Sequence, residues 1–167
     1  MSDKVMVRDA RHQDIPAIQS IYAYHVLHGV GSWEKTPPEI DEMVTRHDTI
    51  TKNKYPYYVG TIDGEVLGYA YVCSYRPRPA YQFTVENSVY VANDAARRGI
   101  GLTLLDALIS QCTFLGFRRM VAIIGDSANY PSIGLHKKAG FHHVGIIPAC
   151  GFKHEKWLDQ VIMQRAL

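Results

Sequence analysis

The spacing of apolar positions changes several times along the first part of the chain, and each change predicts a new element. Residues 4–10 alternate between apolar and polar side chains as a strand does. From Asp14 and Pro16 to Gly29 the apolar positions recur every three or four residues, which predicts a helix. A second, more polar helix is predicted to start with Thr36 as its N-cap, ahead of two prolines. The chain is therefore predicted to begin with one strand and two helices.

The middle of the chain predicts strands joined by turns. Asp63 and Gly64 form a dipeptide suited to the positive φ angles of a tight turn, so residues 57–75 are predicted to form a β-hairpin. A loop rich in proline and arginine follows, and residues 83–92 then read as a further strand. The loop is interpreted as a turn inside one domain.

The second half alternates helices and strands. A long apolar helix is predicted over residues 99–115 and a short apolar strand over 118–125. A short helix then ends at Gly140, where a helix C-cap needs a left-handed residue. Two strands follow, over 141–152 and 156–166.

The predicted order has seven strands and four helices and gives an α/β (α+β) fold with a mixed sheet. The unit made of a strand, a helix and a strand between residues 83 and 125 favours parallel pairing through a right-handed crossover. With 167 residues, 47% of them hydrophobic, the chain can form one core, so residues 1–167 are expected to be a single domain.

Charge and composition exclude several classes of function. The formal net charge is +2 and the basic residues are scattered, which is no footprint of nucleic-acid binding. No apolar run approaches the roughly 20 residues of a membrane span, and the first residues lack the apolar core of a secretory signal. We therefore expect a cytoplasmic protein with neither nucleic acid nor membrane as a partner.

The three cysteines are widely spaced and form no C-x-x-C pair. Cys73, Cys112 and Cys150 all lie in apolar contexts, which favours buried thiols in a reducing compartment over disulfides or metal ligands. We expect no metal site.

The segment from Arg97 to Gly101, "RRGIG", lies between a predicted strand and the start of a long helix. The first turn of a helix has unpaired N–H groups and a partial positive charge, so this layout is typical of an anion site. It lacks the first glycine and the lysine of a P-loop, and Leu104 stands where a dinucleotide fingerprint needs its third glycine. An ordinary helix start with solvated arginines is the alternative.

Six stretches occur in the order and spacing of one known family: "GEVLGYAYV", "TVENSVYV", "RRGIG", "VAIIG", "NYPSIGLHKKAGF" and "GFKHEKWLDQVIMQ". Over nearly its whole length the chain resembles the GNAT acetyltransferases, and within them the phosphinothricin and methionine sulfoximine N-acetyltransferases. The resemblance implies a GNAT fold whose fourth and fifth strands splay apart, with acetyl-CoA in the gap. It also implies a homodimer.

The resemblance implies which residues bind acetyl-CoA. Three strand residues would pair with the pantetheine arm, the arginine and glycine segment would hold the pyrophosphate, and two residues near the short helix would contact the arm and the adenosine end. In chain order these residues are Val89, Tyr90, Val91, Arg97, Arg98, Gly99, Ile100, Gly101, Leu102, Asn129 and Lys138.

Acetyl transfer to an amine needs a base, because alkyl amines are protonated at neutral pH. Glu86 lies in an otherwise apolar and hydroxyl-bearing strand, where partial desolvation would raise its pKa, and the resemblance implies a carboxylate base at this position. A glutamate that faces solvent is the alternative. The backbone N–H of Tyr90 or a neighbour would stabilise the oxyanion. His136 stands where many GNAT enzymes have a tyrosine, and it either assists proton transfer or packs against the cofactor.

Selectivity for the amine is expected from the loop before this strand. Arg76 or Arg78, on either side of Pro77, is suited to binding an α-carboxylate in a bidentate manner, unless both are merely solvated. Asn87 and Ser88 are expected at the amine end. The loop reads Tyr-Arg-Pro where family members have Trp-Arg-Pro, which leaves the shape of the pocket open.

The leading hypothesis is an N-acetyltransferase that acetylates the α-amine of an amino acid such as methionine sulfoximine, methionine sulfone or phosphinothricin. The amine would attack acetyl-CoA directly in a ternary complex, and detoxification would be the role. The alternatives are a protein or polyamine acetyltransferase and a non-catalytic acyl-CoA binding module.

Overall fold

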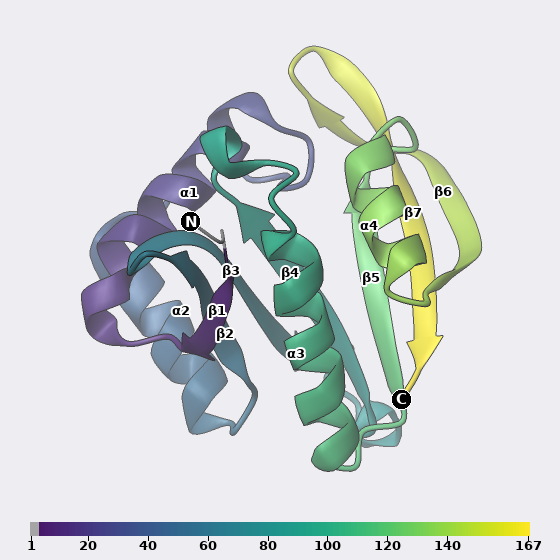
Figure 1. Ribbon diagram of the computed structural model, residues 1–167. Coiled ribbons are helices and arrows are strands. Elements are labelled where there is room, and N and C mark those ends of the chain that lie inside the picture. The colour runs from purple at the N-terminus through teal and green to yellow at the C-terminus, as the bar shows by residue number, and fades with distance from the viewer. Residues whose placement is uncertain (1–3) are drawn as a thin grey trace.

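The computed structural model describes residues 4–167, which form seven strands and four α-helices in the predicted order (Figure 1). Three short 3-10 helices accompany them: η1 (His12–Asp14), η2 (Pro79–Tyr81) and η3 (Asn93–Ala95). The main elements are β1 (Met6–Asp9), α1 (Ile15–His28), α2 (Ile40–Lys52), β2 (Tyr57–Ile62), β3 (Glu65–Ser74), β4 (Thr84–Val91), α3 (Ile100–Phe114), β5 (Arg119–Gly125), α4 (Tyr130–Lys138), β6 (His142–Lys153) and β7 (Lys156–Ala166).

All seven strands belong to one sheet, in the order β1-β2-β3-β4-β5-β7-β6. Within it β4 and β5 are parallel, as the sequence predicted, and the other neighbours are antiparallel. The β4–β5 ladder is short: it begins at Thr84↔Arg119 and its last pair is Glu86↔Val121. Beyond this pair the two strands diverge, which is the splay that the sequence predicted (Figure 1).

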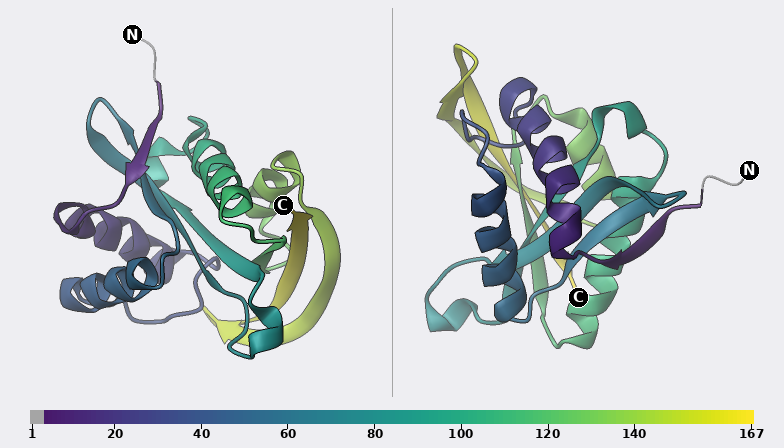
Figure 2. Two further views of the ribbon diagram at one scale, coloured as in Figure 1. Left: turned by 90° about the horizontal axis from the view of Figure 1, so that it is seen from below. Right: turned by 90° about the vertical axis from the view of Figure 1, so that its left-hand side faces the viewer.

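The helices cover both faces of the sheet. Helices α1 and α2 lie on one face, and α3 and α4 lie on the other (Figure 2). A hydrophobic core lies on each face of the sheet, and the side chains of β3 alternate between the two. Tyr69 packs in the core beneath α1 and α2, while Ala70 and Val72 pack beneath α3. No helix among residues 4–167 combines the length and the apolar character that crossing a membrane requires.

Two predicted turns are confirmed by backbone angles. Asp63 and Gly64 have φ angles of 51° and 85°, as a tight hairpin turn requires. Gly140 has a φ angle of 85° just after α4, as the predicted C-cap requires.

The predicted start of the second helix is wrong. Helix α2 begins at Ile40, and Thr36 lies outside it. Pro38 follows Pro37, and a residue that precedes proline is disfavoured in helical geometry. The helix therefore starts after the prolines, and Gln19 of α1 donates a hydrogen bond to the carbonyl of Pro38 at 3.0 Å.

The prediction of three buried thiols is also wrong. Cys112 is buried in the core under α3, but Cys73 is half-buried and Cys150 is exposed. Cys150 lies on β6, an edge strand whose pairing with β7 is irregular between Ile147 and Gly151. Apolar residues on an edge strand of this kind stay exposed to solvent. All three cysteines are free, as expected.

The loop between α1 and α2 crosses to the other half of the sheet and is tied to the β6–β7 hairpin. Lys153 donates to the carbonyl of Ser32 at 2.5 Å, and His154 donates to that of Gly29 at 3.1 Å. The indole of Trp33 packs so close to Gly151 that a Cβ there would lie 2.6 Å from its Cζ3. A glycine is therefore needed where the loop meets β6.

We predict that Gly151→Ala destabilises the protein, because the rigid indole ring and the strand must both move. Overpacking of this kind costs about 1–3 kcal/mol, which lowers Tm by roughly 2–4 °C per kcal/mol in a domain of this size. Gly145→Ala on the same strand is the control, because a Cβ there meets nothing within 4 Å. Thermal unfolding measures both, and equal Tm values for the two variants would contradict the packing argument.

Candidate active site

The side chains of β4 point alternately to the two faces of the sheet. Val85 packs in the core under α3, and Asn87 contacts His136 of α4. Tyr90 contacts Tyr22 of α1, with ring centroids 5.2 Å apart. By the two-residue period of a strand, the side chains of Glu86 and Ser88 share the α1/α2 face with Tyr90. The predicted Asn87 and Ser88 are thus on opposite faces, and only Ser88 accompanies Glu86.

The backbone of β4 alternates as well. The N–H of Ala92 donates to Leu67 and the carbonyl of Thr84 accepts from Tyr75, and the β3–β4 register between them is unbroken. The even-numbered residues of β4 therefore pair with β3. The N–H and C=O groups of the odd-numbered residues point toward β5, which diverges after Glu86.

The difference between odd- and even-numbered residues shows which of the predicted backbone contacts can face the gap. Val89 and Val91 direct backbone groups into the gap, whereas the N–H of Tyr90 belongs to the ladder with β3. Of the predicted oxyanion donors, the neighbours of Tyr90 therefore face the gap. The carbonyl of Val91 accepts a hydrogen bond from Nε2 of His25 at 2.8 Å, so the N–H of Val91 is the group left toward the gap.

The side chain of Asn87 adds one more hydrogen bond between β4 and β5 where their backbone pairing ends. Its Nδ2 donates to the carbonyl of Val121 at 3.2 Å, directly after the last backbone pair. Its Oδ1 lies 3.0 Å from Nε2 of His136. Asn87 is 6% exposed and His136 is 4% exposed, so this contact is sealed from water. The pair links β4 and β5 to α4 at the start of the splay.

His136 is held between two oxygen atoms. Its Nδ1 lies 2.8 Å from the carbonyl of Ser132, and its Nε2 faces Oδ1 of Asn87. A neutral imidazole has one N–H and can satisfy only one of these acceptors, whereas the imidazolium satisfies both. Burial lowers the pKa of His136, and the Ser132 carbonyl acts in the opposite direction. Both ring nitrogens are engaged within the protein, which favours a positioning role.

Glu86 is a partly desolvated carboxylate. Burial raises its pKa, and the charge of Arg76 opposes the rise. Cys73 lies opposite it on β3, and burial, with the nearby Glu86 charge, raises the pKa of this thiol to about 11. The desolvation expected from the sequence is present, and a carboxylate with a raised pKa is suited to accept a proton near neutral pH.

A wall of tyrosines extends from Glu86 on the α1/α2 face, and the sequence analysis missed it. The centroids of Tyr69 and Tyr90 are 5.4 Å apart and those of Tyr57 and Tyr71 are 5.0 Å apart. Ser88 hydrogen-bonds Tyr71 and lowers its pKa against the larger effect of burial. The signal was the alternation of Tyr69 and Tyr71 along a predicted strand, which places both rings on one face.

A small cavity of about 20 Å³ opens among these rings. Its lining residues are Tyr22, Met43, Arg46, Ile50, Tyr57, Tyr69 and Tyr71. Arg46 is held there by Glu34 through two contacts of 3.0 and 2.7 Å, and Glu34 also accepts a hydrogen bond from Tyr22. The α1/α2 face beside β4 is thus aromatic, with one internally paired arginine.

The arginine and glycine segment forms the start of α3. Arg97 and Gly99 have φ angles of 65° and 82°, so the backbone turns sharply twice before Ile100, the first helical residue. Ile100 is buried and anchors this end. The first N–H groups of the helix, including those of Gly101 and Leu102, have no partner within the helix. Amides fixed in this way can bind an anion.

The two predicted contacts on α4 differ in their surroundings. Asn129 is the N-cap of α4: its Oδ1 accepts from the N–H of Ser132 and its Nδ2 donates to the carbonyl of Gly125 at 2.7 Å. Its amide is therefore already engaged by α4 and by the last residue of β5. Lys138 is exposed in the last turn of α4.

The loop arginines are both exposed. The guanidinium carbon of Arg76 lies 5.0 Å from the ring centroid of Tyr75, and Ser74 donates to the Arg76 carbonyl at 2.8 Å. The charge of Arg76 acts on the pKa of Glu86. Arg78 precedes η2 at its N-terminal end. Arg76 is thus the loop arginine that the structure associates with Glu86.

Comparison with known proteins shows which family the chain resembles. The family model described as "Acetyltransferase (GNAT) domain" matches residues 7–162. The chain is 47% identical over 161 residues to the phosphinothricin N-acetyltransferase of Alcaligenes faecalis, an alignment that covers 96% of this chain and 82% of that protein. It is 40% identical to the L-methionine sulfoximine/L-methionine sulfone acetyltransferase of Pseudomonas aeruginosa, over 95% of this chain and 92% of that one.

A solved structure is similar throughout. The crystal structure of a GNAT superfamily phosphinothricin acetyltransferase from Sinorhizobium meliloti, in complex with AcCoA, superposes with a TM-score of 0.95 at 47% sequence identity. The match covers 98% of this chain and 88% of that one.

We predict that Asn87 and His136 are energetically coupled. Asn87→Ala leaves the Val121 carbonyl and one imidazole nitrogen buried without this partner, and each such loss costs about 1–3 kcal/mol. A double-mutant cycle with His136→Ala, measured by denaturant unfolding, should give a coupling energy of about 0.5–3 kcal/mol. Additive losses, within about 0.5 kcal/mol, would show that the contact contributes nothing of its own.

Proposed function

We propose, from the premise that this chain belongs to the GNAT acetyltransferase family, that it acetylates the α-amine of a small amino acid analogue. The chain is an N-acetyltransferase, and acetyl-CoA is its co-substrate. The relatives that act on phosphinothricin and on methionine sulfoximine or sulfone support this substrate class. The observation that carries the proposal is the partly desolvated carboxylate of Glu86 beside Arg76, at the point where β4 and β5 part.

We assign acetyl-CoA to the gap between β4 and β5. An extended arm with amide groups matches the N–H and C=O groups of Val89 and the N–H of Val91, which face this gap. The start of α3, from Arg97 to Leu102, suits the pyrophosphate because helix amides and arginines both favour anions. Acetyl-CoA supplies the acetyl group and a thiol as leaving group.

We assign Glu86 the role of general base. The substrate arrives as an ammonium ion, and the carboxylate removes one proton so that the nitrogen lone pair is available for attack. The new C–N bond replaces the C–S bond, and the thiolate leaves with the second proton that the nitrogen loses as it becomes an amide. Backbone N–H groups of β4 that face the gap stabilise the negative charge on the acetyl oxygen. Attack is direct, in a ternary complex.

His136 acts through Asn87 in this scheme. It lies behind β4, on the face opposite Glu86, and holds the amide that makes the last rung with Val121. We therefore assign His136 and Asn87 as positioning residues that fix the start of the gap.

The substrate would lie on the α1/α2 face. Arg76 is exposed and close enough to act on Glu86, so a carboxylate bound to it would leave the neighbouring α-amine near the base. The tyrosines around Ser88 and Tyr71 would surround the side chain of the substrate. A protein tail or a polyamine has no carboxylate next to its amine, and this distinguishes those substrates in an assay.

A thiol-release assay with acetyl-CoA tests the function. The panel comprises phosphinothricin, methionine sulfoximine, methionine sulfone, ordinary amino acids, polyamines and a peptide. The highest kcat/KM should belong to the amino acid analogues, with intersecting initial-velocity lines. Turnover of polyamines or peptide alone would replace the proposed substrate class, and parallel lines with a trapped acetyl-enzyme would exclude direct transfer.

We predict that Glu86→Gln lowers kcat/KM by about 10²- to 10⁴-fold while stabilising the fold at pH 7. The folded-state pKa of Glu86 is raised, so its ionised form is destabilising. This cost is absent below the ordinary glutamate pKa of about 4.3, grows as the pH rises from there toward the folded-state pKa, and is complete above it. The Tm of the variant should therefore exceed the wild-type Tm at pH 7, and the two should converge near pH 4.

Glu86→Asp is the companion variant, because it keeps the charge and withdraws the carboxylate. It should lose activity without the gain in Tm. Full activity of Glu86→Gln at neutral pH would remove the residue from the reaction.

We predict that Arg76→Ala raises the KM for the amino acid about 10- to 100-fold, the loss expected for a charge-assisted hydrogen bond worth about 1.5–3 kcal/mol. The KM for acetyl-CoA should stay unchanged. Removal of the Arg76 charge should also raise the pKa of Glu86 further and move the acidic limb of the rate profile to higher pH. Arg78→Ala is the matched control, and a larger effect there would reassign the carboxylate site.

A further inference from the structure

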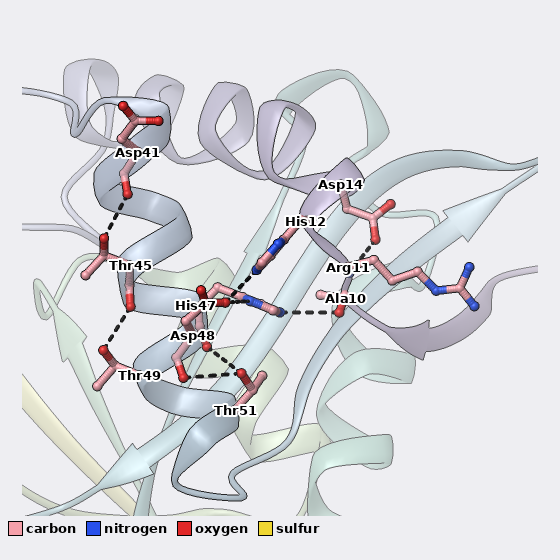
Figure 3. Close-up of polar contacts among 10 residues, drawn as sticks. All are labelled: Ala10, Arg11, His12, Asp14, Asp41, Thr45, His47, Asp48, Thr49 and Thr51. Atoms are coloured by element: carbon pink, nitrogen blue, oxygen red, sulfur yellow. Dashed lines mark hydrogen bonds and ion pairs between the residues drawn. The ribbon is translucent and has the colours of Figure 1, made fainter.

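A second group of polar side chains converges between η1 and α2, outside the proposed active site (Figure 3). His12 belongs to η1, and His47 and Asp48 are consecutive in α2. Nε2 of His12 lies 2.6 Å from Oδ1 of Asp48, and Nδ1 of His47 lies 3.1 Å from the same oxygen. One ligand atom from each residue lies within 4.8 Å of the other two.

The His47 ring is fixed by its surroundings. His47 is 6% exposed and packs edge-on against Tyr57, with ring centroids 4.9 Å apart. Its Nε2 lies 3.3 Å from the carbonyl of Ala10, as Figure 3 shows. With its N–H on Nε2, the neutral ring donates to this carbonyl and turns the lone pair of Nδ1 toward Asp48.

This lone pair points at a carboxylate oxygen. In this tautomer Nδ1 of His47 and Oδ1 of Asp48 are both acceptors, and they lie 3.1 Å apart. Two acceptors at this distance repel each other unless a proton or a cation lies between them. The imidazole of His12 approaches the same oxygen from η1, so all three groups surround one point.

We propose that His12, His47 and Asp48 form a binding site for a divalent transition-metal ion of the Zn²⁺ type. Two imidazole nitrogens and one carboxylate oxygen are a donor set that Zn²⁺ accepts, whereas Mg²⁺ and Ca²⁺ prefer oxygen donors alone. The Ala10 carbonyl supplies the outer contact that metal-bound histidines usually make through their second nitrogen.

The two contacts to Asp48 can be compared with the ligand spacing of such a site, and the nitrogens of His12 and His47 lie within 4.8 Å of each other. Ligand atoms about 2.05 Å from a tetrahedral ion lie about 3.3 Å from one another. The contact between His47 and Asp48 is already close to this value, and His12 has to withdraw by roughly 0.7 Å. The side chains of His12 and Asp48 are 62% and 52% exposed and are able to adjust. Water completes the coordination on the exposed side.

The ion would join two elements that the sequence separates by more than thirty residues. It would bind η1, which leads directly into α1, to the C-terminal half of α2. None of the three ligands belongs to the proposed acetyl-transfer site, so the ion acts on stability and not on the reaction. Without a metal, the contact between His12 and Asp48 is an exposed polar contact, which contributes little to stability.

Metal binding is tested on the full-length protein after removal of any affinity tag and treatment with a chelator. Titration calorimetry with Zn²⁺ should show one site per chain that Mg²⁺ does not occupy. His12→Gln and Asp48→Asn should each weaken Zn²⁺ binding by about 10- to 100-fold or more. Both positions are exposed, so neither variant is expected to unfold. His142→Ala is the control, because it removes an exposed histidine elsewhere.

Two further readouts separate this site from adventitious binding. Bound Co²⁺ should give visible d–d absorption that is lost in His12→Gln and kept in His142→Ala. Zn²⁺ at about 100 times its Kd should raise Tm by roughly 5–10 °C in wild type and not in Asp48→Asn. If Zn²⁺ binds equally well to wild type and both ligand variants, or does not bind to wild type, the cluster is an ion pair and the proposal is overturned.

Discussion

The site depends on one constraint, the end of the parallel ladder between β4 and β5 after Glu86 and Val121. Up to this pair the strands share backbone hydrogen bonds, and beyond it the backbone groups of β4 that face β5 have no strand partner there. Buried backbone groups require partners, so this geometry favours an extended ligand with amides of its own. Asn87 fixes where the parting begins, because its side chain forms one more rung to the Val121 carbonyl.

Residues 86–88 of β4 face opposite sides of the sheet in turn, so neighbouring side chains lie in different environments. Glu86 and Ser88 face the tyrosines on the α1/α2 side, while Asn87 faces His136 on the α4 side. Glu86 thus lies on the aromatic side, where burial raises its pKa, and the residues that hold the backbone remain on the other face. A one-residue shift of register would exchange these environments. The unbroken β3–β4 ladder therefore fixes which side chains of β4 face the tyrosines.

Local patterns predicted most of the fold because turns and periodicity are local. Asp63-Gly64 and Gly140 marked their turns correctly, since each requires a backbone angle that few residues adopt. Thr36 failed because the two prolines after it displaced the helix start, and Cys150 failed because edge position depends on the whole sheet. The link between Asn87 and His136 could not be predicted, because it joins residues 49 positions apart through tertiary packing.

Arg46 and Arg76 differ in whether a carboxylate of the protein already pairs with them, and this decides which one could bind a substrate carboxylate. Arg46 makes a two-point contact with Glu34, which holds α2 against the loop after α1, and a further contact of 2.9 Å with Glu42 within α2. A substrate carboxylate would have to displace Glu34 to reach it.

Among residues 4–167, Arg76 has no carboxylate within ion-pair distance. It stacks on Tyr75, and its charge lowers the pKa of Glu86. A bound carboxylate therefore gains a partner at Arg76 without breaking an internal pair, and it partly neutralises the charge that keeps the pKa of Glu86 down. Substrate binding would in this way make the base stronger at the moment it is needed.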